Sequence, residues 1–203
     1  AGALRLAGPL ALTPGSTVAT RGVLRVDGAV RGEGLLLSGA RVEVEGAVDA
    51  QAEIVARRSV RLARGVRLRY PSTIFAALET GGETDRIEIA SATVEGTVVV
   101  PESELGGPAA VRLEMAPEAR VVGAVLSLST ADVEGRIDGT LFARRFRFFS
   151  SPAVFVNWLR DVTVDARARP EDFVVPVGVG EGTPSFVVVR RGVRSSFVSP
   201  GDA

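Results

Sequence analysis

The chain has no cysteine and no histidine, and aromatic residues make up only 5% of its 203 residues. Without cysteine it can form neither a disulfide scaffold nor a thiolate nucleophile. Without histidine it lacks the general base of a Ser-His-Asp triad and the imidazole ligands common in zinc sites. The sequence therefore predicts no catalytic, cofactor-binding or metal-binding residue and no cofactor.

Long apolar runs and an excess of charge are missing as well. No run reaches the roughly 18 apolar residues of a membrane-spanning helix, and no signal peptide is visible. The 24 basic residues, all arginine, are balanced by 24 acidic ones, so we expect no binding to nucleic acid. Because the chain begins at Ala1 and not at Met, we expect that an upstream segment was removed, and that any membrane contact comes through that segment.

An aliphatic residue recurs at every sixth position through the first third of the chain. A short strand points alternate side chains inward, so a bend every six residues would make a three-sided coil of about 18 residues around a narrow core. The pattern predicts an all-β fold, a single-stranded parallel β-helix (β-solenoid) with triangular coils. An ordinary β-sandwich, the alternative, would show variable loops between strands. The predicted core ladder is Leu6, Leu12, Val18, Leu24, Val30, Leu36, Val42, Val48, Ile54, Val60 and Val66.

A second ladder of mostly small residues lies four positions after each aliphatic residue. It includes Gly22, Gly28, Gly34, Ala40 and Gly46. Small residues suit places where the backbone bends or where there is no room for a side chain. We therefore expect the bends at these positions, with Gly28 stacked on Gly46.

The regular ladder stops after Leu78, but Val-x-Gly-x-Val units return further along, as at 94–98 and 121–125. We predict one solenoid over residues 1–165, with inserted loops near 79–86 and 101–108. Residues 166–203 form a C-terminal extension, in which the apolar runs 173–177 and 186–190 predict strands that cap the end or are exchanged with another copy.

The six-residue ladder and the Val-x-Gly-x-Val units resemble the bactofilin, or polymer-forming, family, clearly over residues 5–78 and loosely over 87–140. This resemblance implies a right-handed triangular β-helix that polymerises end to end without nucleotide and acts as a scaffold near the membrane. Residues 141–165, with Ser150-Ser-Pro152 and Asn157-Trp-Leu-Arg-Asp161, also resemble the C-terminal part of bactofilin-like envelope proteins linked to pilus or secretion systems. The long loops and extra strands depart from simple bactofilins. The ladder also resembles the left-handed hexapeptide helices of acyltransferases, which commonly use a catalytic histidine that this chain lacks.

Arginines dominate the stretch from Ile54 to Leu78, which contains no acidic residue. On a solenoid they would form a basic stripe that binds an acidic polysaccharide or a protein partner, or a solvated face paired with acids elsewhere. The candidates are Arg57, Arg58, Arg61, Arg64, Arg67 and Arg69. An acidic zone follows, and opposite zones favour ordered self-association. Its members are Glu79, Glu83, Asp85, Glu88, Glu95, Glu102, Glu104, Glu114 and Glu118.

Most of the aromatic residues fall in 141–158, where Arg and Phe alternate. Period-2 alternation on a strand puts Phe142, Phe146 and Phe148 on one face and Arg145 and Arg147 on the other. We interpret this as in-out alternation, since the chain carries no excess positive charge for stacking on nucleic acid.

Together these features predict a non-enzymatic structural protein that self-assembles into a filament or scaffold of the cell envelope, as a homo-oligomer or polymer. The resemblance implies a place at the cell surface or outside the cell, with a membrane-associated cytoskeleton as the alternative, and a pilus or secretion protein as a partner. One alternative function is a monomeric surface module that binds through the basic stripe. A more remote one is a carbohydrate-active β-helix enzyme, which needs two close carboxylates. The nearest candidates are Asp132, Glu134 and Asp138, and then Asp161 and Asp165.

Overall fold

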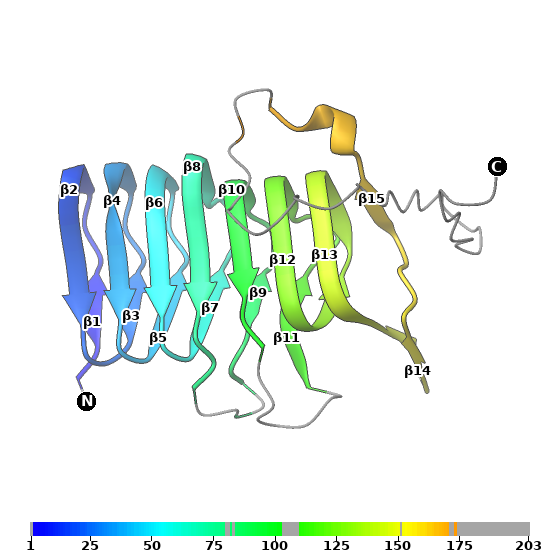
Figure 1. Cartoon of the computed structure of the whole chain (residues 1–203). Helices are drawn as coiled ribbons and strands as arrows, with labels where there is room; N and C mark the ends of the chain where they lie inside the picture. Colours follow the sequence, from blue (N-terminus) through cyan, green and yellow to red (C-terminus); the bar gives the residue numbers. More distant parts are fainter. Residues whose placement is uncertain are drawn as a thin grey trace.

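The fold is a stack of parallel strands that wraps around one elongated core (Figure 1). It is seen in a computed structural model, which describes residues 2–79, 82, 84–102, 110–150, 152–170 and 173. Apart from one three-residue 3-10 helix, η1 (Ala166–Ala168), all regular structure in these residues is β. The expected all-β, parallel, solenoid-like fold is confirmed.

Short and long strands alternate along the chain and form two ladders. The short strands pair in the order β1-β3-β5-β7-β9-β11 and the long ones in the order β2-β4-β6-β8-β10-β12, every pair being parallel. The short strands are β1 (Leu4–Leu6), β3 (Leu24–Val26), β5 (Arg41–Val44), β7 (Ser59–Leu62), β9 (Ile87–Ile89) and β11 (Val111–Met115). The long strands are β2 (Leu10–Thr20), β4 (Val30–Ser38), β6 (Val48–Ala56), β8 (Arg67–Ala76) and β10 (Thr93–Val100).

Strand β12 (Arg120–Val133) joins the two ladders, because its first half pairs with β10 and its second half with β11. Strand β13 (Gly135–Ser150) follows β12 along both halves. It then pairs with β14 (Ala153–Val156), the single antiparallel pairing among the described strands, and with β15 (Val162–Val164). The stack therefore ends in strands that depart from its pattern.

The register shows where extra residues enter the stack. Leu24 lies opposite Val42, and Val42 opposite Val60, so each partner is 18 residues further along the chain. Val60 then lies opposite Ile87, and Ile87 opposite Leu113. Most of the added residues lie between β8 and β9 and between β10 and β11, and two lie within β8, where the register against β6 shifts. The apolar column nevertheless continues unbroken.

One core runs through the stack, from Leu12 to Ile137. Nine of the eleven ladder residues are buried, while Leu6 and Val18 in the first coil are partly buried and pack against the core. Strand β6 shows the cause, since its side chains alternate between buried and more exposed along its length. The aliphatic ladder is thus the inward column of successive strands.

Glycines lie where neighbouring coils approach most closely at a bend. A Cβ on Gly46 would come within 2.1 Å of the carbonyl oxygen of Gly28, and one on Gly28 would meet Gly8 at the same distance. Gly123 adds a second reason, because its φ of +139° is a backbone conformation that side chains disfavour. Glycine at these positions lets the chain turn without pushing two coils apart.

The expectation that Phe142, Phe146 and Phe148 share one face is wrong. Phe146 packs against the core, whereas Phe142 is 51% exposed and points outward. The register between β12 and β13 shifts at this point, with Ala143 opposite Ser127 but Arg145 opposite Thr130. This irregularity interrupts the period-2 alternation between Phe142 and Phe146.

Candidate functional site

A column of charged side chains runs along the outer face of the short strands. Strand pairing places Arg25 beside Glu43, Glu43 beside Arg61 and Arg61 beside Glu88, and Glu114 follows on β11. Each residue alternates with buried neighbours in its own strand, as in the sequence Leu24-Arg-Val26. In-out alternation thus sends the charges outward, and the parallel register aligns them.

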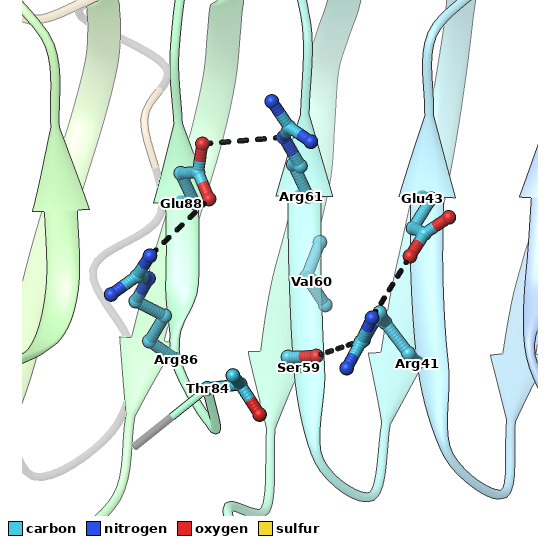
Figure 2. Close-up of a pocket in the computed structure, with 8 residues that line it drawn as sticks. All are labelled: Arg41, Glu43, Ser59, Val60, Arg61, Thr84, Arg86 and Glu88. Atoms are coloured by element: carbon cyan, nitrogen blue, oxygen red, sulfur yellow. Dashed lines mark hydrogen bonds and ion pairs between the residues drawn. The ribbon is translucent and has the colours of Figure 1, made fainter.

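Opposite charges in this column bind one another across strands (Figure 2). Arg25 Nε lies 2.7 Å from Glu43 Oε2, and Arg61 Nε lies 3.2 Å from Glu88 Oε1. Arg86 Nε lies 3.3 Å from a carboxylate oxygen of Glu114. The result is a ladder of exposed ion pairs, in which each pair adds little stability but the charges are matched.

A shallow hollow of about 150 Å³ lies on this face between β5, β7 and β9 (Figure 2). Arg41 donates to the Ser59 hydroxyl at 3.1 Å and to Glu43 at 3.2 Å. On the other side of the hollow, Arg86 Nη2 lies 3.9 Å from Glu88. The arginines that line the hollow already have acceptors within the chain. We therefore interpret the hollow as a space between paired charges of the ladder and not as an anion-binding site.

The six arginines of the expected basic stripe are spread over several elements, and five of them have an acidic partner. Arg57 donates to Glu79 at 2.7 Å, Arg58 to Asp85 at 3.1 Å and Arg67 to Glu95 at 2.8 Å. Arg61 pairs with Glu88, as above, and Arg69 donates to Asp49 at 2.6 Å. Arg64 is exposed in the turn between β7 and β8, and no ion pair within the described residues includes it.

Four of these acidic partners come from the predicted acidic zone. The acidic zone and the basic stripe therefore lie side by side on the folded chain. Glu79, Asp85, Glu88 and Glu95 lie on the next coil and meet their arginines 22 to 28 residues away. The sequence does not show this directly, because the inserted loop hides the register. Glu83 and Glu104 lie outside the described residues. The face matches the interpretation of a solvated surface paired with acids.

The pKa shifts on this surface follow from the ion pairs. The hydrogen bond from Arg69 lowers the pKa of Asp49, and that from Arg57 lowers the pKa of Glu79. The same bond to Asp49 raises the pKa of Arg69. Each pair thus favours the charged state of both partners over the whole physiological range.

Two carboxylates near the C-terminal end are shifted in opposite directions. Burial raises the pKa of Asp138, but hydrogen bonds from Arg136 at 2.7 Å and Arg120 at 2.8 Å outweigh it, so the pKa lies below its usual range. For Asp132, burial raises the pKa and the attraction of Arg147 does not offset it. A raised pKa is what a general acid needs, but it is not by itself a site.

The other carboxylates that were considered for chemistry have local roles. Asp161 forms an ion pair with Arg160 at 2.9 Å, and Asp165 accepts the backbone N–H of Arg167 at the start of η1. Among the described residues, no group of three or more carboxylates is placed to hold a metal ion.

A buried arginine that the sequence analysis did not single out holds the first inserted loop. Arg112 on β11 is 1% exposed, and its Nη1 donates to the backbone oxygens of Gly82 and Asp85 at 2.8 Å each. Asp85 is itself fully buried and receives the hydrogen bond from Arg58. An arginine inside the Val111-Arg-Leu113 run, where a strand should alternate, was the available signal.

An aromatic contact ties the C-terminal extension to the outer face of the stack. Phe173 is 7% exposed and packs against Tyr70, Ala124 and Leu126. The rings of Tyr70 and Phe173 lie 5.7 Å apart, and a Cβ on Gly123 would come within 2.4 Å of the Phe173 ring. The remaining residues of the predicted strands 173–177 and 186–190 lie outside the described residues.

The two ends of the stack differ. At the N-terminal end, β1 and β2 each pair with one neighbour among the described strands, and Leu4, Leu6, Leu10 and Val18 are only partly buried. At the C-terminal end, β14 and β15 extend along parts of β13. The N-terminal coil therefore presents both unpaired backbone and apolar core.

Comparison with protein-family models, with curated proteins and with solved structures finds no significant match to this chain. Within the described residues, no helix is long and apolar enough to cross a bilayer.

Proposed function

We propose that this chain is a structural protein that assembles with copies of itself through the N-terminal end of a right-handed parallel β-helix with triangular coils near 18 residues. The observation that carries the proposal is the open first coil. No other described strand pairs with the outer side of β1 or β2, and the aliphatic ladder at Leu6 and Val18 is only partly covered. Exposed edges pair with other chains unless something blunts them.

The edge of β2 is irregular in its middle, and this irregularity favours a partner strand that fits it. Gly15 has a φ of +79°, and the register against β4 shifts between Leu12 and Ser16. Pro14 in the same segment has no N–H to donate. The irregular segment between Leu12 and Ser16 thereby divides the edge of β2 into two regular parts. A strand that adds to this edge has to carry the same irregularity at the same position. A second copy of a stack built on the same register is one such partner.

The charges on the sides of the stack are largely paired within the chain, which favours assembly through the ends of the stack over ligand binding on its sides. The arginines considered for an acidic polymer are mostly engaged by acids of the same chain. The resemblance to bactofilins, carried by the ladder itself, adds to the proposal a scaffold at the cell envelope. It is also the basis for the proposed right-handed sense of the coils.

Substitutions that introduce negative charge at the N-terminal end of the stack test the proposal. The double variant Leu10→Glu and Val18→Glu adds two carboxylates at partly buried apolar positions of the first coil, where they can still reach water. We expect sedimentation velocity to show large assemblies for the unchanged chain and single rods for the variant. Removal of residues 1–12 should likewise abolish or redirect assembly.

Leu37→Glu is the matched control, because Leu37 is 37% exposed on the outer side of β4. It should leave assembly intact. Circular dichroism checks that each variant keeps its β signal. Assembly that is unchanged in both the folded double variant and the truncated chain would refute the role of the N-terminal end.

A further inference from the structure

The β13–β14 hairpin exposes apolar side chains on one face. Antiparallel pairing sets Phe149 opposite Val154 and Arg147 opposite Val156, and side chains at paired positions project from the same side of a hairpin. Phe149, Val154 and Val156 are 56%, 52% and 51% exposed. Three large apolar groups therefore lie together on a surface that the described residues leave open.

The opposite face of the same hairpin is aromatic. Phe148 and Phe155 form a cross-strand pair with ring centroids 5.9 Å apart, and Trp158 packs on Phe155 at 5.5 Å. Trp158 is nevertheless 59% exposed. The guanidinium of Arg160 lies 5.0 Å from the centre of the Phe148 ring. Apart from Arg147, which shares the face of Val156, the hairpin is thus apolar on both sides, which is unusual for a surface element.

Positive charge surrounds these rings. The segment from Gly139 to Arg160 contains four arginines and no acidic residue. Arg144 and Arg160 are more than half exposed, and their ion pairs, with Glu102 and Asp161, use acids from outside the segment. Around the hairpin turn, Ser150, Pro152 and Ala153 carry no charge. The turn could therefore enter an apolar boundary without burying an ion.

In contrast to the expectation that membrane contact comes only through an upstream segment, we propose that this hairpin is a membrane-interface anchor that inserts at the headgroup level of an anionic lipid bilayer. A groove on a protein partner would cover one face of the hairpin, whereas a bilayer boundary surrounds both. Tryptophan and phenylalanine are favoured at that boundary, and arginine side chains attract anionic headgroups while their stems stay in the apolar layer.

The backbone limits the depth of insertion. Among the described strands, β14 pairs only with β13, so the outer edge of β14 has backbone groups that need water or headgroups as partners. Such groups are costly in hydrocarbon, which confines the hairpin to the interface. Figure 1 shows β14 beside the C-terminal end of the stack, where the hairpin can meet a flat surface without disturbing the coils.

The single tryptophan of the chain makes the test specific, because all tryptophan emission comes from Trp158. The full chain is mixed with vesicles of equal parts phosphatidylcholine and phosphatidylglycerol, and with vesicles of phosphatidylcholine alone. We expect a blue shift of the emission and co-flotation with the anionic vesicles, and weaker binding to the neutral ones. Absence of both signals with anionic vesicles overturns the proposal.

Paired variants locate the contact. Phe149→Glu with Val154→Glu should weaken vesicle binding at least about tenfold, because two apolar contacts are replaced by repelled charges. Leu128→Glu, on an exposed leucine of β12 outside the hairpin, should bind as the unchanged chain does. Equal binding by the hairpin variant would contradict the proposal.

A quenching control separates the bilayer from other occupants. If acrylamide fails to quench Trp158 before lipid is added, another part of the chain or a second copy already covers the hairpin, and the proposal is overturned. Since the readout is local to Trp158, it does not depend on whether copies join through the N-terminal end.

Discussion

At the scale of single residues, Arg112 holds described residues of the first inserted loop against the stack. It is buried inside a strand, and its guanidinium satisfies the backbone oxygens of Gly82 and Asp85. Arginine suits this position because a single guanidinium nitrogen, Nη1, carries two N–H groups that reach both acceptors. Through these two hydrogen bonds, Arg112 attaches Gly82 and Asp85 of the inserted loop to strand β11.

We expect Arg112→Ala to lower the free energy of unfolding markedly. Each backbone oxygen left without a donor costs about 1–3 kcal/mol, and the buried Asp85 loses part of its surroundings. Urea denaturation followed by circular dichroism measures the change. Arg64→Ala, at an exposed turn position, should change the stability by less than about 0.5 kcal/mol. Equal effects of the two variants would refute the proposed role of Arg112.

Asp132 and Asp138 should show opposite pH dependence. The ionised Asp138 carboxylate stabilises the fold above the ordinary carboxyl pKa of about 3.9, and this stabilisation is lost as the pH falls through its lowered pKa. The raised pKa of Asp132 means the reverse: its contribution is favourable below the ordinary pKa and is lost as the pH rises through the raised value.

At neutral pH, Asp138→Asn should therefore destabilise the fold and Asp132→Asn should stabilise it. The difference for Asp132→Asn should shrink as the pH falls through the raised pKa toward the ordinary carboxyl pKa. The difference for Asp138→Asn should shrink only below the ordinary carboxyl pKa, as the pH falls through the lowered value. Urea denaturation midpoints at neutral and acid pH give the comparison, and the two variants serve as controls for each other. A shift of the same sign for both at neutral pH would contradict this assignment.

At the scale of elements, Phe173 is a described residue of the C-terminal extension that contacts the body of the stack. The Phe173 ring packs beside Tyr70 and occupies space that a Cβ on Gly123 would need. The contact lies on an outer face that elsewhere carries exposed side chains. It holds the extension, which includes η1, to the body of the protein at Phe173.

Phe173→Ala should release this segment and speed tryptic cleavage after Arg167, an exposed residue of η1, several-fold. The bond after Arg169 is protected in any case, because proline follows it. Mass spectrometry of the fragment that ends at Arg167 measures the rate. Phe142→Ala, at an exposed ring of β13 outside the Phe173 cluster, is the control. An unchanged rate in the Phe173 variant would show that the contact does not hold the extension.

The inward side of the elements could be predicted from the sequence, and the outward side largely could not. Aliphatic spacing identifies the buried column because burial follows strand alternation. The partners of Arg58 and Arg61 depend on which coil is the neighbour, and an inserted loop changes that distance in sequence. The exposed Phe142 was mispredicted for a related reason, since one register shift reverses the direction of every side chain beyond it.

At the scale of the whole molecule, charges are matched within the chain and apolar surface gathers at the two ends. Glu79, Asp85, Glu88 and Glu95 pair with arginines of the preceding coil, so few of these charges remain to join two copies. The proposed assembly therefore relies on strand edges and apolar contact, and we expect it to survive molar salt, which screens exposed ion pairs. The proposed lipid contact lies at the opposite end, so the two do not compete.

Electron microscopy of the purified chain at rising concentration, in low and in molar salt, tests the central claim most directly. We expect rods joined through their ends under both conditions, with an axial strand spacing of about 4.8 Å in ordered assemblies. Single short rods at every concentration and at both salt levels would contradict self-assembly.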